Sequence, residues 1–312
     1  MRDSEKPQIL GIGRAPQFSP NCVDRDAAIL QAVAEILRSR DYVVHICSEE
    51  ALPDWQGYVA AFSMARHPQA LGALARWEAD GFPVINSARS LQACDRADLT
   101  ARCIAAGVPM PPFRLLCADE PDGALAQLDG MYFPLWLKRC EACAQHEDDV
   151  CHAADAAEAH AALVRFHRRG ISRVMACPHQ VGDLVKFYGV LDTGFFYHYY
   201  PIVEGSTGKF GLERHNGRPL GFQVQTEKLH AAAETAARVT GLSVYGGDAI
   251  ISADGSFQII DFNDWPSFSR CRAEAAVAIA DCLCAAIRGR RSPMCPHDTA
   301  HAPAGQDALL GI

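Results

Sequence analysis

Long apolar runs are missing from this sequence, and none reaches the roughly 18 residues that suggest a membrane-spanning helix. An excess of positive charge is missing as well: the formal net charge is -8, which gives no overall basic field to attract nucleic acid or anionic lipid. The N-terminal residues show no signal-peptide pattern, so we expect a cytoplasmic protein without nucleic-acid or membrane partners. With 312 residues, 49% of them hydrophobic and 21% charged, the chain has the balance of a globular protein of two or three domains.

Two familiar motifs are incomplete. Among the 13 cysteines only Cys140 and Cys143 form a CxxC pair, and no second pair lies at zinc-ribbon spacing. We interpret the cysteines mainly as small buried side chains, and a redox or metal role for this pair stays open. The segment GIGRAP at 11–16 lacks the third glycine of a dinucleotide fingerprint. It predicts a tight turn at the mouth of a cleft, with Arg14 facing a substrate.

The first 87 residues alternate between buried strands and amphipathic helices. Strands are predicted over 8–13, 42–46, 57–62 and 82–85, and helices over 24–40 and 71–79. Strands that are joined by crossover helices form a parallel sheet. We therefore expect a Rossmann-like module.

The remainder of the chain mixes helices with strands and hairpins. Helices are predicted over 88–107, 153–168, 225–240 and 272–288, strands over 113–117, 133–138 and 173–176, and hairpins over 183–201 and 244–262. Residues 203–221 are expected to form a polar loop. The tail 292–312 is rich in Pro, His and Ala, and we expect it to be disordered.

The clearest chemical signal lies on the second predicted hairpin, in YGGDAIISADGSFQIIDFNDWP at 245–266. Alternate residues of a strand share a face, so Asp261 and Asn263 point the same way, and Asp248 on the partner strand can face the same cleft. Two carboxylates and an amide oxygen form an all-oxygen ligand set that suits Mg²⁺. The hairpin therefore predicts a magnesium site.

The order of these elements resembles the metal strands of the ATP-grasp superfamily: G-x-D, a D-G turn, an apolar run, acid-x-Asn and a proline. The resemblance implies that Asp261 and Asn263 bind the magnesium of MgATP, with Asp248 as a further ligand. It implies an α/β protein of the ATP-grasp fold, in which a Rossmann-like N-terminal domain precedes two α+β lobes that clasp ATP. The expected bounds are 1–87 for the first domain and 88–291 for the ATP-grasp domain, with a lid lobe at about 112–178 and a metal-binding lobe at about 179–291.

Upstream segments extend the resemblance over residues 83–270 and imply the contacts to the nucleotide. NSARSLQACDRADL at 86–99 is similar to the helical segment that leads into the fold, PLWLKR at 134–139 to the strand whose lysine contacts the phosphates, and RVMACPHQVGD at 173–183 to the segment around adenine. The glycine-free stretch 139–149 stands where the family has its phosphate-covering loop. The implied nucleotide-binding residues are Arg96, Lys138, His146, Cys177, Asp183 and Lys186.

What the resemblance implies for activity is an ADP-forming enzyme that uses ATP and Mg²⁺, with Mn²⁺ as a substitute. Most of the superfamily are ligases that activate a carboxylate as an acyl phosphate for attack by an amine or a thiol, and we expect that activity here. Catalysis is expected from Lys186 and Arg214, and substrate binding from Arg14, Lys209, Arg214 and His215. Such ligases are often homodimers.

Two alternatives stay open. Residues 138–150 and 183–190 also resemble segments of the ATP-grasp inositol polyphosphate kinases, which phosphorylate an alcohol. A non-catalytic nucleotide-binding protein is the second alternative, although the intact metal ligands speak against it. The sequence does not identify the substrates.

Overall fold

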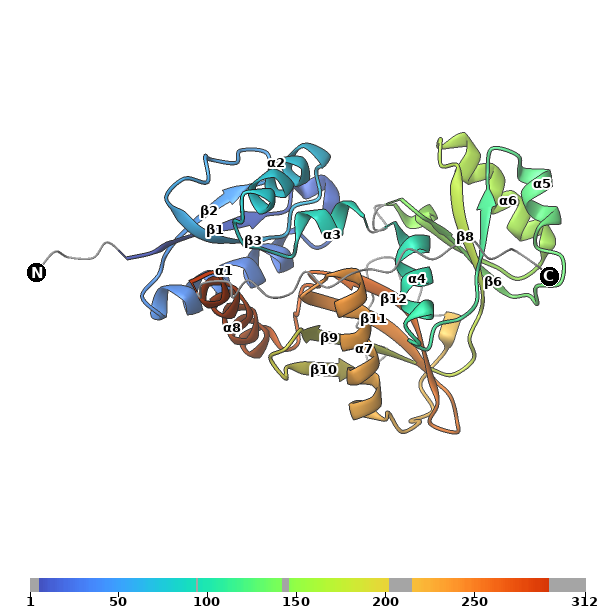
Figure 1. The fold of residues 1–312 in the computed structure, drawn as a ribbon. Coiled ribbons are helices and arrows are strands. Elements are labelled where there is room, and N and C mark those ends of the chain that lie inside the picture. Colours follow the sequence, from blue (N-terminus) through green and yellow to red (C-terminus); the bar gives the residue numbers. More distant parts are fainter. Residues whose placement is uncertain (1–5, 94, 142–145, 202–214, 292–312) are drawn as a thin grey trace, which may run out of the picture.

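The computed structural model describes residues 6–93, 95–141, 146–201 and 215–291. Its described strands form three four-stranded sheets, one in each of three consecutive parts of the chain. Figure 1 shows the N-terminal sheet and its helices on one side, the middle part with β6 and β8 on the other, and the C-terminal part below and between them.

The N-terminal sheet is parallel, as the sequence predicts, with the strand order β2-β1-β3-β4. Its elements are β1 (Gln8–Gly13), the 3₁₀-helix η1 (Pro16–Phe18), α1 (Val23–Ser39), β2 (Val43–Ser48), β3 (Tyr58–Ser63), α2 (Pro68–Ala79) and β4 (Val84–Ile85). Because β1 and β3 are parallel neighbours, the loops that follow them leave the sheet at the same edge. That edge faces the C-terminal part of the chain.

One helix was expected over 88–107, and this prediction is wrong, because two helices cover the segment. They are α3 (Ala88–Gln92) and α4 (Arg96–Ala105). Asp95 interrupts the helix, since its backbone is extended and its side chain accepts hydrogen bonds from the N–H groups of Ala97 and Asp98, at 2.8 and 3.3 Å. A capping aspartate therefore starts α4 as a separate helix. The helical spacing of the apolar residues runs through the whole segment, so the sequence alone did not indicate this break.

The middle part, the lid lobe, contains an antiparallel sheet in the order β5-β8-β6-β7. Its elements are β5 (Arg114–Cys117), α5 (Pro121–Ala126), β6 (Leu135–Arg139), the 3₁₀-helix η2 (Glu147–Asp149), β7 (Val150–Ala153), α6 (Ala156–Arg168) and β8 (Arg173–Pro178). The sequence reading missed α5 and β7. The helix α6 was expected to begin at residue 153 but begins three residues later. Asp155 sets this start, because it caps the helix by accepting from the N–H of Glu158 at 2.9 Å.

The C-terminal part, which is expected to hold the metal and is therefore called the metal-binding lobe, contains the second antiparallel sheet, in the order β10-β9-β11-β12. Its elements are β9 (Asp183–Val190), β10 (Phe196–Tyr199), α7 (Thr226–Thr240), β11 (Val244–Ile251), β12 (Phe257–Asp264) and α8 (Arg272–Arg291). Both predicted hairpins are present, and pairing of β9 with β11 joins them into one sheet. The expected tail at 292–312 lies outside the described residues.

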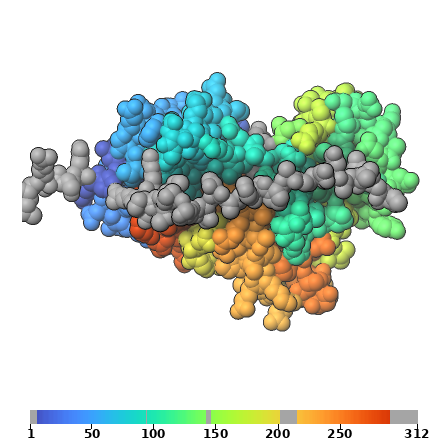
Figure 2. All heavy atoms as spheres, in the orientation of Figure 1, coloured from blue at the N-terminus to red at the C-terminus, as the bar shows by residue number. Residues whose placement is uncertain are grey.

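The cores show which parts are packed together. Ile29 and Val33 of α1 share one buried cluster with Ile279 and Leu283 of α8, so the N-terminal module is packed on the metal-binding lobe. The lid lobe has a separate core around α6 and its own sheet. Figure 2 shows the lid lobe (green) set apart from the N-terminal module (blue) by a notch in the surface. No helix among the described residues is long and apolar enough to cross a membrane.

Candidate active site

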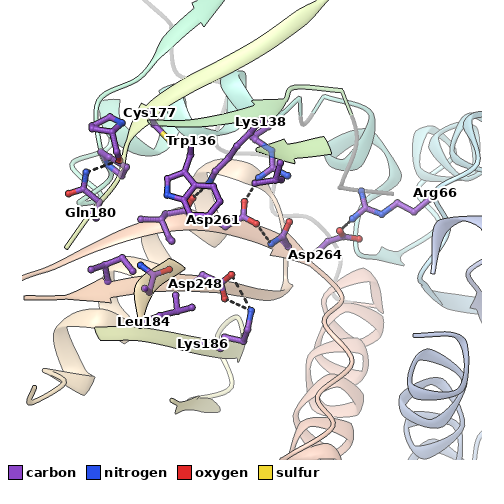
Figure 3. Close-up of a pocket in the computed structure, with 18 of the residues that line it drawn as sticks. Arg66, Trp136, Lys138, Cys177, Gln180, Leu184, Lys186, Asp248, Asp261 and Asp264 are labelled. Carbon is purple, nitrogen blue, oxygen red and sulfur yellow. Dashed lines mark hydrogen bonds and ion pairs between the residues drawn. The ribbon is translucent and has the colours of Figure 1, made fainter. Parts of the chain in front are cut away.

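A cavity of about 300 Å³ lies between the sheets of the lid lobe and the metal-binding lobe and reaches the edge of the N-terminal sheet. Strands β6, β8, β9, β11 and β12 contribute side chains to its wall. Figure 3 shows Gln180 and Cys177 at one end, Arg66 and Asp264 at the other, and Asp261 between them. Residues that are far apart in the sequence therefore meet in one elongated site.

Three charged residues stand side by side on neighbouring strands of the metal-binding lobe. Asp248 on β11 is the register partner of Lys186 on β9 and of Asp261 on β12. Directly opposed residues of an antiparallel sheet project from the same face, so the three side chains meet in the cavity. The Nζ of Lys186 donates to both carboxylate oxygens of Asp248, at 2.9 and 3.2 Å.

Asp261 is the most strongly perturbed carboxyl group of this row. Arg96 donates a hydrogen bond to its Oδ1, and the amide of Asn263 donates to its Oδ2 at 3.0 Å. Burial alone would raise the pKa of Asp261, but the charges of Arg96 and Lys138 outweigh burial and lower the pKa to about 2. The group is therefore ionised at neutral pH and available as a metal ligand.

Magnesium fits this donor set. Asp248, Asp261 and Asn263 supply carboxylate and amide oxygens from one face of the hairpin, which are the hard ligands that the ion prefers. Among the described residues no three His, Cys, Asp or Glu side chains gather into a metal site of their own. Magnesium is usually held by one or two carboxylates, with phosphate oxygens and water completing its shell. The hairpin suits an ion that binds together with a nucleotide.

The lid lobe supplies the opposite wall of the cavity. Lys138 on β6 is buried and donates to the carbonyl oxygen of Ile260 at 2.7 Å, so it bridges the two lobes beside Asp261. Cys177 on β8 lines the cavity, and burial raises the pKa of its thiol. Trp136 adds an aromatic surface nearby. This end of the cavity is therefore more apolar than the end at Arg66 and Asp264.

Three sequence candidates lie elsewhere or only at the edge. Asp183 does not line the cavity; its oxygens accept from the backbone N–H groups of residues 220, 221 and 222 at 2.6–2.8 Å and tie that segment to β9. His146 lies at the N-cap of η2, where its ring accepts from the N–H of Asp148 at 3.2 Å. His215 stacks on His152 of the lid lobe with ring centroids 4.4 Å apart. Lys209 and Arg214 lie outside the described residues.

Arg14 lines the cavity from the loop that follows β1. Its Nε donates to the carbonyl oxygen of Met64 at 3.1 Å, and its Nη1 donates to Asp26 at 3.2 Å. Its Nη2 lies 3.4 Å from the carbonyl oxygen of Trp265, just after β12. The guanidinium thus joins the edge of the N-terminal sheet to the end of β12, and it also faces the cavity.

Sequence reading missed three charged residues at this end, namely Glu49, Arg66 and Asp264. Arg66 follows β3 and forms an ion pair with Asp264, the last residue of β12. Glu49 is buried and accepts from the N–H groups of Ala15, Arg66 and His67 at 2.5–2.6 Å, which fixes the loops after β1 and β3 together. The available signal was positional: ligands of open parallel sheets gather at the carboxyl ends of adjacent strands.

No protein-family model matches this sequence, and no curated protein matches it. Solved structures do. A RimK domain ATP-grasp protein from Sphaerobacter thermophilus is 20% identical with a TM-score of 0.65, over 88% of this chain and 99% of that one. D-alanine–D-alanine ligase from Bacillus anthracis, solved with ATP, is 16% identical with a TM-score of 0.68, over 92% and 99%. The ATP-grasp ligase PsnB, complexed with the precursor peptide PsnA2 and AMPPNP, is 16% identical with a TM-score of 0.61, over 92% and 99%.

These likenesses extend over most of each chain, and they confirm the predicted fold class. A parallel N-terminal sheet followed by two antiparallel α+β lobes is the ATP-grasp fold. At such low identity the likeness establishes the fold alone.

Proposed function

We propose that this chain, which has the ATP-grasp fold, is a MgATP-dependent, ADP-forming ligase that activates a carboxylate as an acyl phosphate for attack by an amine or a thiol. One observation carries the proposal. Cationic Lys138, Lys186 and Arg96 line the same cavity as the oxygen ligands Asp261 and Asn263. Phosphoryl transfer needs just such a combination, because the protein positions the reactants and neutralises charge rather than supplying a nucleophile.

Each of these residues has a place in the proposed reaction. Asp261 and Asn263, with Asp248, would hold magnesium, which when bound supplies positive charge to the phosphate oxygens. Lys138 reaches the phosphates from the lid lobe and Lys186 from the metal-binding lobe. Both lysines stabilise the negative charge that spreads over the transferring phosphoryl group. The apolar end of the cavity at Cys177 suits the adenine ring.

The substrate end of the cavity is more polar. We propose that Arg14 contacts the substrates at this end, and that Lys209 and Arg214, outside the described residues, belong to the same set. The ring of His215 lies 5.4 Å from that of Trp136, so a substrate contact by His215 would be made at the other end of the cavity. The first step forms a bond from a carboxylate oxygen to the γ-phosphorus and releases ADP, and no protein group is consumed. The similar solved structures include ligases, among them D-alanine–D-alanine ligase and PsnB. This likeness favours a carboxylate over an alcohol as the phosphate acceptor.

The kinase alternative has less support. It depends on Lys186 and on an expected position of His146 near the phosphates. Lys186 can serve either reaction. His146 lies instead at the start of η2 and is not among the residues that line the cavity. We keep residues 1–87 and 88–291 as the proposed domains, and a cytoplasmic homodimer as the proposed state of the protein.

The fate of the phosphate tests the proposal. The protein is incubated with MgATP, hydroxylamine and one member at a time of a set of small carboxylic acids and amino acids. ADP and a hydroxamate should appear together and only with an accepted acid, because hydroxylamine traps the acyl phosphate. The Asp261→Asn variant should give neither product. A stable phosphate ester formed from an alcohol would replace the ligase with the kinase, and failure to bind MgATP would remove both.

A further inference from the structure

Asp264 has a buried oxygen that makes no hydrogen bond to any residue that the structure describes. Its side chain is 2% exposed and lines the cavity, and Arg66 pairs with one of its oxygens, Oδ1. The other oxygen, Oδ2, has no hydrogen-bond partner among the described residues. The Nη2 of Arg14 lies 4.0 Å from it, which is an ion-pair separation beyond hydrogen-bond range. Leaving a buried carboxylate oxygen without a donor costs free energy, so this oxygen is suited to accept a hydrogen bond from a ligand.

The position of Asp264 brings that ligand close to the reacting groups. Asp264 directly follows the metal-ligand candidate Asn263 on β12. Figure 3 shows its carboxylate between Arg66 and Asp261. A group bound at Oδ2 therefore lies beside the phosphoryl-transfer centre and far from the apolar end at Cys177.

We propose that Oδ2 of Asp264 accepts a hydrogen bond from the nucleophilic substrate, and that this contact selects an amine rather than a thiol. The inference rests on the proposed ligase function and decides between the two nucleophile classes that the fold allows. A neutral amine has N–H groups to donate. A thiol is a weak donor, and a thiolate has no hydrogen to donate and would place negative charge against Asp264.

The two arginines are paired with carboxylates, Arg14 with Asp26 and Arg66 with Asp264, so their charges are balanced at this end of the cavity. The neutral amine is the nucleophilic form. The amine nitrogen then forms a bond to the carbonyl carbon of the acyl phosphate. The bond from that carbon to the phosphate oxygen breaks, and its electron pair leaves with the phosphate. Phosphate takes the proton that the nitrogen releases, so the products are an amide and hydrogen phosphate.

Asp264→Asn is the direct test. Arg66 holds the amide oxygen in this variant, so the amide NH₂ takes the place of Oδ2 and presents a donor where the amine needs an acceptor. Asp26→Asn is the matched control, because Asp26 is also buried and pairs with Arg14 but does not line the cavity. Asp264→Glu keeps the charge and moves the acceptor, which provides a second variant if Asp264→Asn does not fold.

Ethanolamine and 2-mercaptoethanol, which differ only in NH₂ against SH, serve as nucleophiles with the acid identified by hydroxamate trapping. In Asp264→Asn the KM for ethanolamine should rise by about tenfold or more, as expected for a lost hydrogen bond to a charged group, with the KM for ATP unchanged. Turnover of 2-mercaptoethanol should change by less than about twofold, and Asp26→Asn should leave the preference for the amine intact. An equal loss with both nucleophiles, or the same change of preference in Asp26→Asn, would overturn the inference.

A binding measurement separates this inference from the proposed function. Ethanolamine is titrated calorimetrically into the protein saturated with Mg²⁺ and AMP-PNP, a condition that needs no turnover. The wild-type protein should bind it, and Asp264→Asn should bind it at least about tenfold more weakly. Absence of binding to the wild-type protein overturns the inference even where hydroxamate forms. Absence of hydroxamate with every acid overturns the ligase proposal even where ethanolamine binds through Asp264.

Discussion

Arg96, in the first turn of α4, donates a hydrogen bond to Oδ1 of Asp261 on β12. The Nε of the same guanidinium donates to the carbonyl oxygen of Arg139, at the end of the lid strand β6, at 3.2 Å. One side chain therefore links the helix after the N-terminal module to both lobes of the ATP-grasp fold. A phosphate group bound beside Arg96 would compete with Asp261 for its donors, so this contact joins the stability of the fold to its ligand chemistry.

Replacing Arg96 by glutamine should destabilise the protein, because Asp261 keeps its charge in a site only 25% exposed and loses its closest cation. We expect the free energy of unfolding to fall by about 2–4 kcal/mol, as when one partner of a largely buried ion pair is removed. Urea denaturation at pH 7 measures the change. Arg96→Lys should lose less, since it keeps the charge but not the planar geometry.

The matched control for that prediction is Arg102→Gln on the same helix. Arg102 is half-buried and donates to the carbonyl oxygen of Ala93 at 3.0 Å in an exposed hydrogen bond, so its loss should cost less than about 1 kcal/mol. Equal destabilisation by Arg96→Gln and Arg102→Gln would show that the ion pair with Asp261 contributes nothing particular.

Removing a metal-ligand candidate should abolish the magnesium dependence of nucleotide binding. We expect AMP-PNP to bind the wild-type protein much more tightly with Mg²⁺ than without it. In Asp261→Asn and in Asn263→Ala the two affinities should be alike, because the ion loses an oxygen ligand. Calorimetric titration with and without Mg²⁺ measures both affinities.

Asp254→Asn provides the control on the same hairpin. Asp254 is exposed in the turn between β11 and β12, where its side chain accepts from the N–H of Ser256 at 2.9 Å, and asparagine can make the same contact. In Asp254→Asn the effect of Mg²⁺ on the affinity for AMP-PNP should be the same as in the wild-type protein. An undiminished magnesium effect in Asp261→Asn would exclude that residue as a ligand.

Local patterns in the sequence were enough to predict most of the strands and the face that Asp261 and Asn263 share. A period of two on β12 places Asp261 and Asn263 on one face, and the D-G turn fixes which strand Asp248 occupies. The alternation of strands and helices likewise predicts the parallel N-terminal sheet. These features depend on neighbours in the chain, which a single sequence records.

Contacts between distant segments could not be predicted in this way. Arg66 and Asp264 are nearly 200 residues apart, and nothing local to either indicates that β12 ends at the edge of the N-terminal sheet. The carboxylate of Asp183 was expected to bind the nucleotide, yet it accepts hydrogen bonds from the backbone of residues 220–222. The packing of the lobes decides which side chains become partners. The type of a side chain alone does not indicate its partner.

Gly247 should not tolerate a side chain. A Cβ at this position would lie 2.5 Å from the ring of the fully buried Phe187 and would also meet the carbonyl oxygen of Asp261. Gly247→Ala should therefore lower the free energy of unfolding by about 2 kcal/mol or more through overpacking, and weaken MgAMP-PNP binding by shifting β12. Chemical denaturation and calorimetry measure the two effects.

Gly72→Ala is the opposite case, on an uncrowded face of α2. The nearest atom to a Cβ there, on Arg76, is 3.8 Å away, and alanine is the better helix former. We expect Gly72→Ala to stabilise the protein by about 0.5–1 kcal/mol. The crowding of β11 is disproved if Gly247→Ala is as stable as the wild type.

Cys140, the first residue of the CxxC pair, should behave as a buried structural thiol. Burial, with a smaller contribution from the charge of Asp95, raises its pKa from the ordinary 9.0 to about 12. Since the folded pKa is the higher one, the stabilisation is complete below pH 9 and is lost as the pH rises from 9 towards 12. The free energy of unfolding of the wild type should therefore approach that of Cys140→Ala over this range.

Alkylation at pH 8.5 gives a direct readout of the same property, because iodoacetamide reacts with the thiolate. The exposed Cys117 should be labelled within minutes in the native protein, whereas the fully buried Cys140 should react only after urea unfolds the chain. Peptide mass spectrometry assigns the two sites. Labelling of native Cys140 at the rate of Cys117 would mean that its thiol is accessible and ionised. It would favour a redox role for Cys140 together with Cys143, which lies outside the described residues.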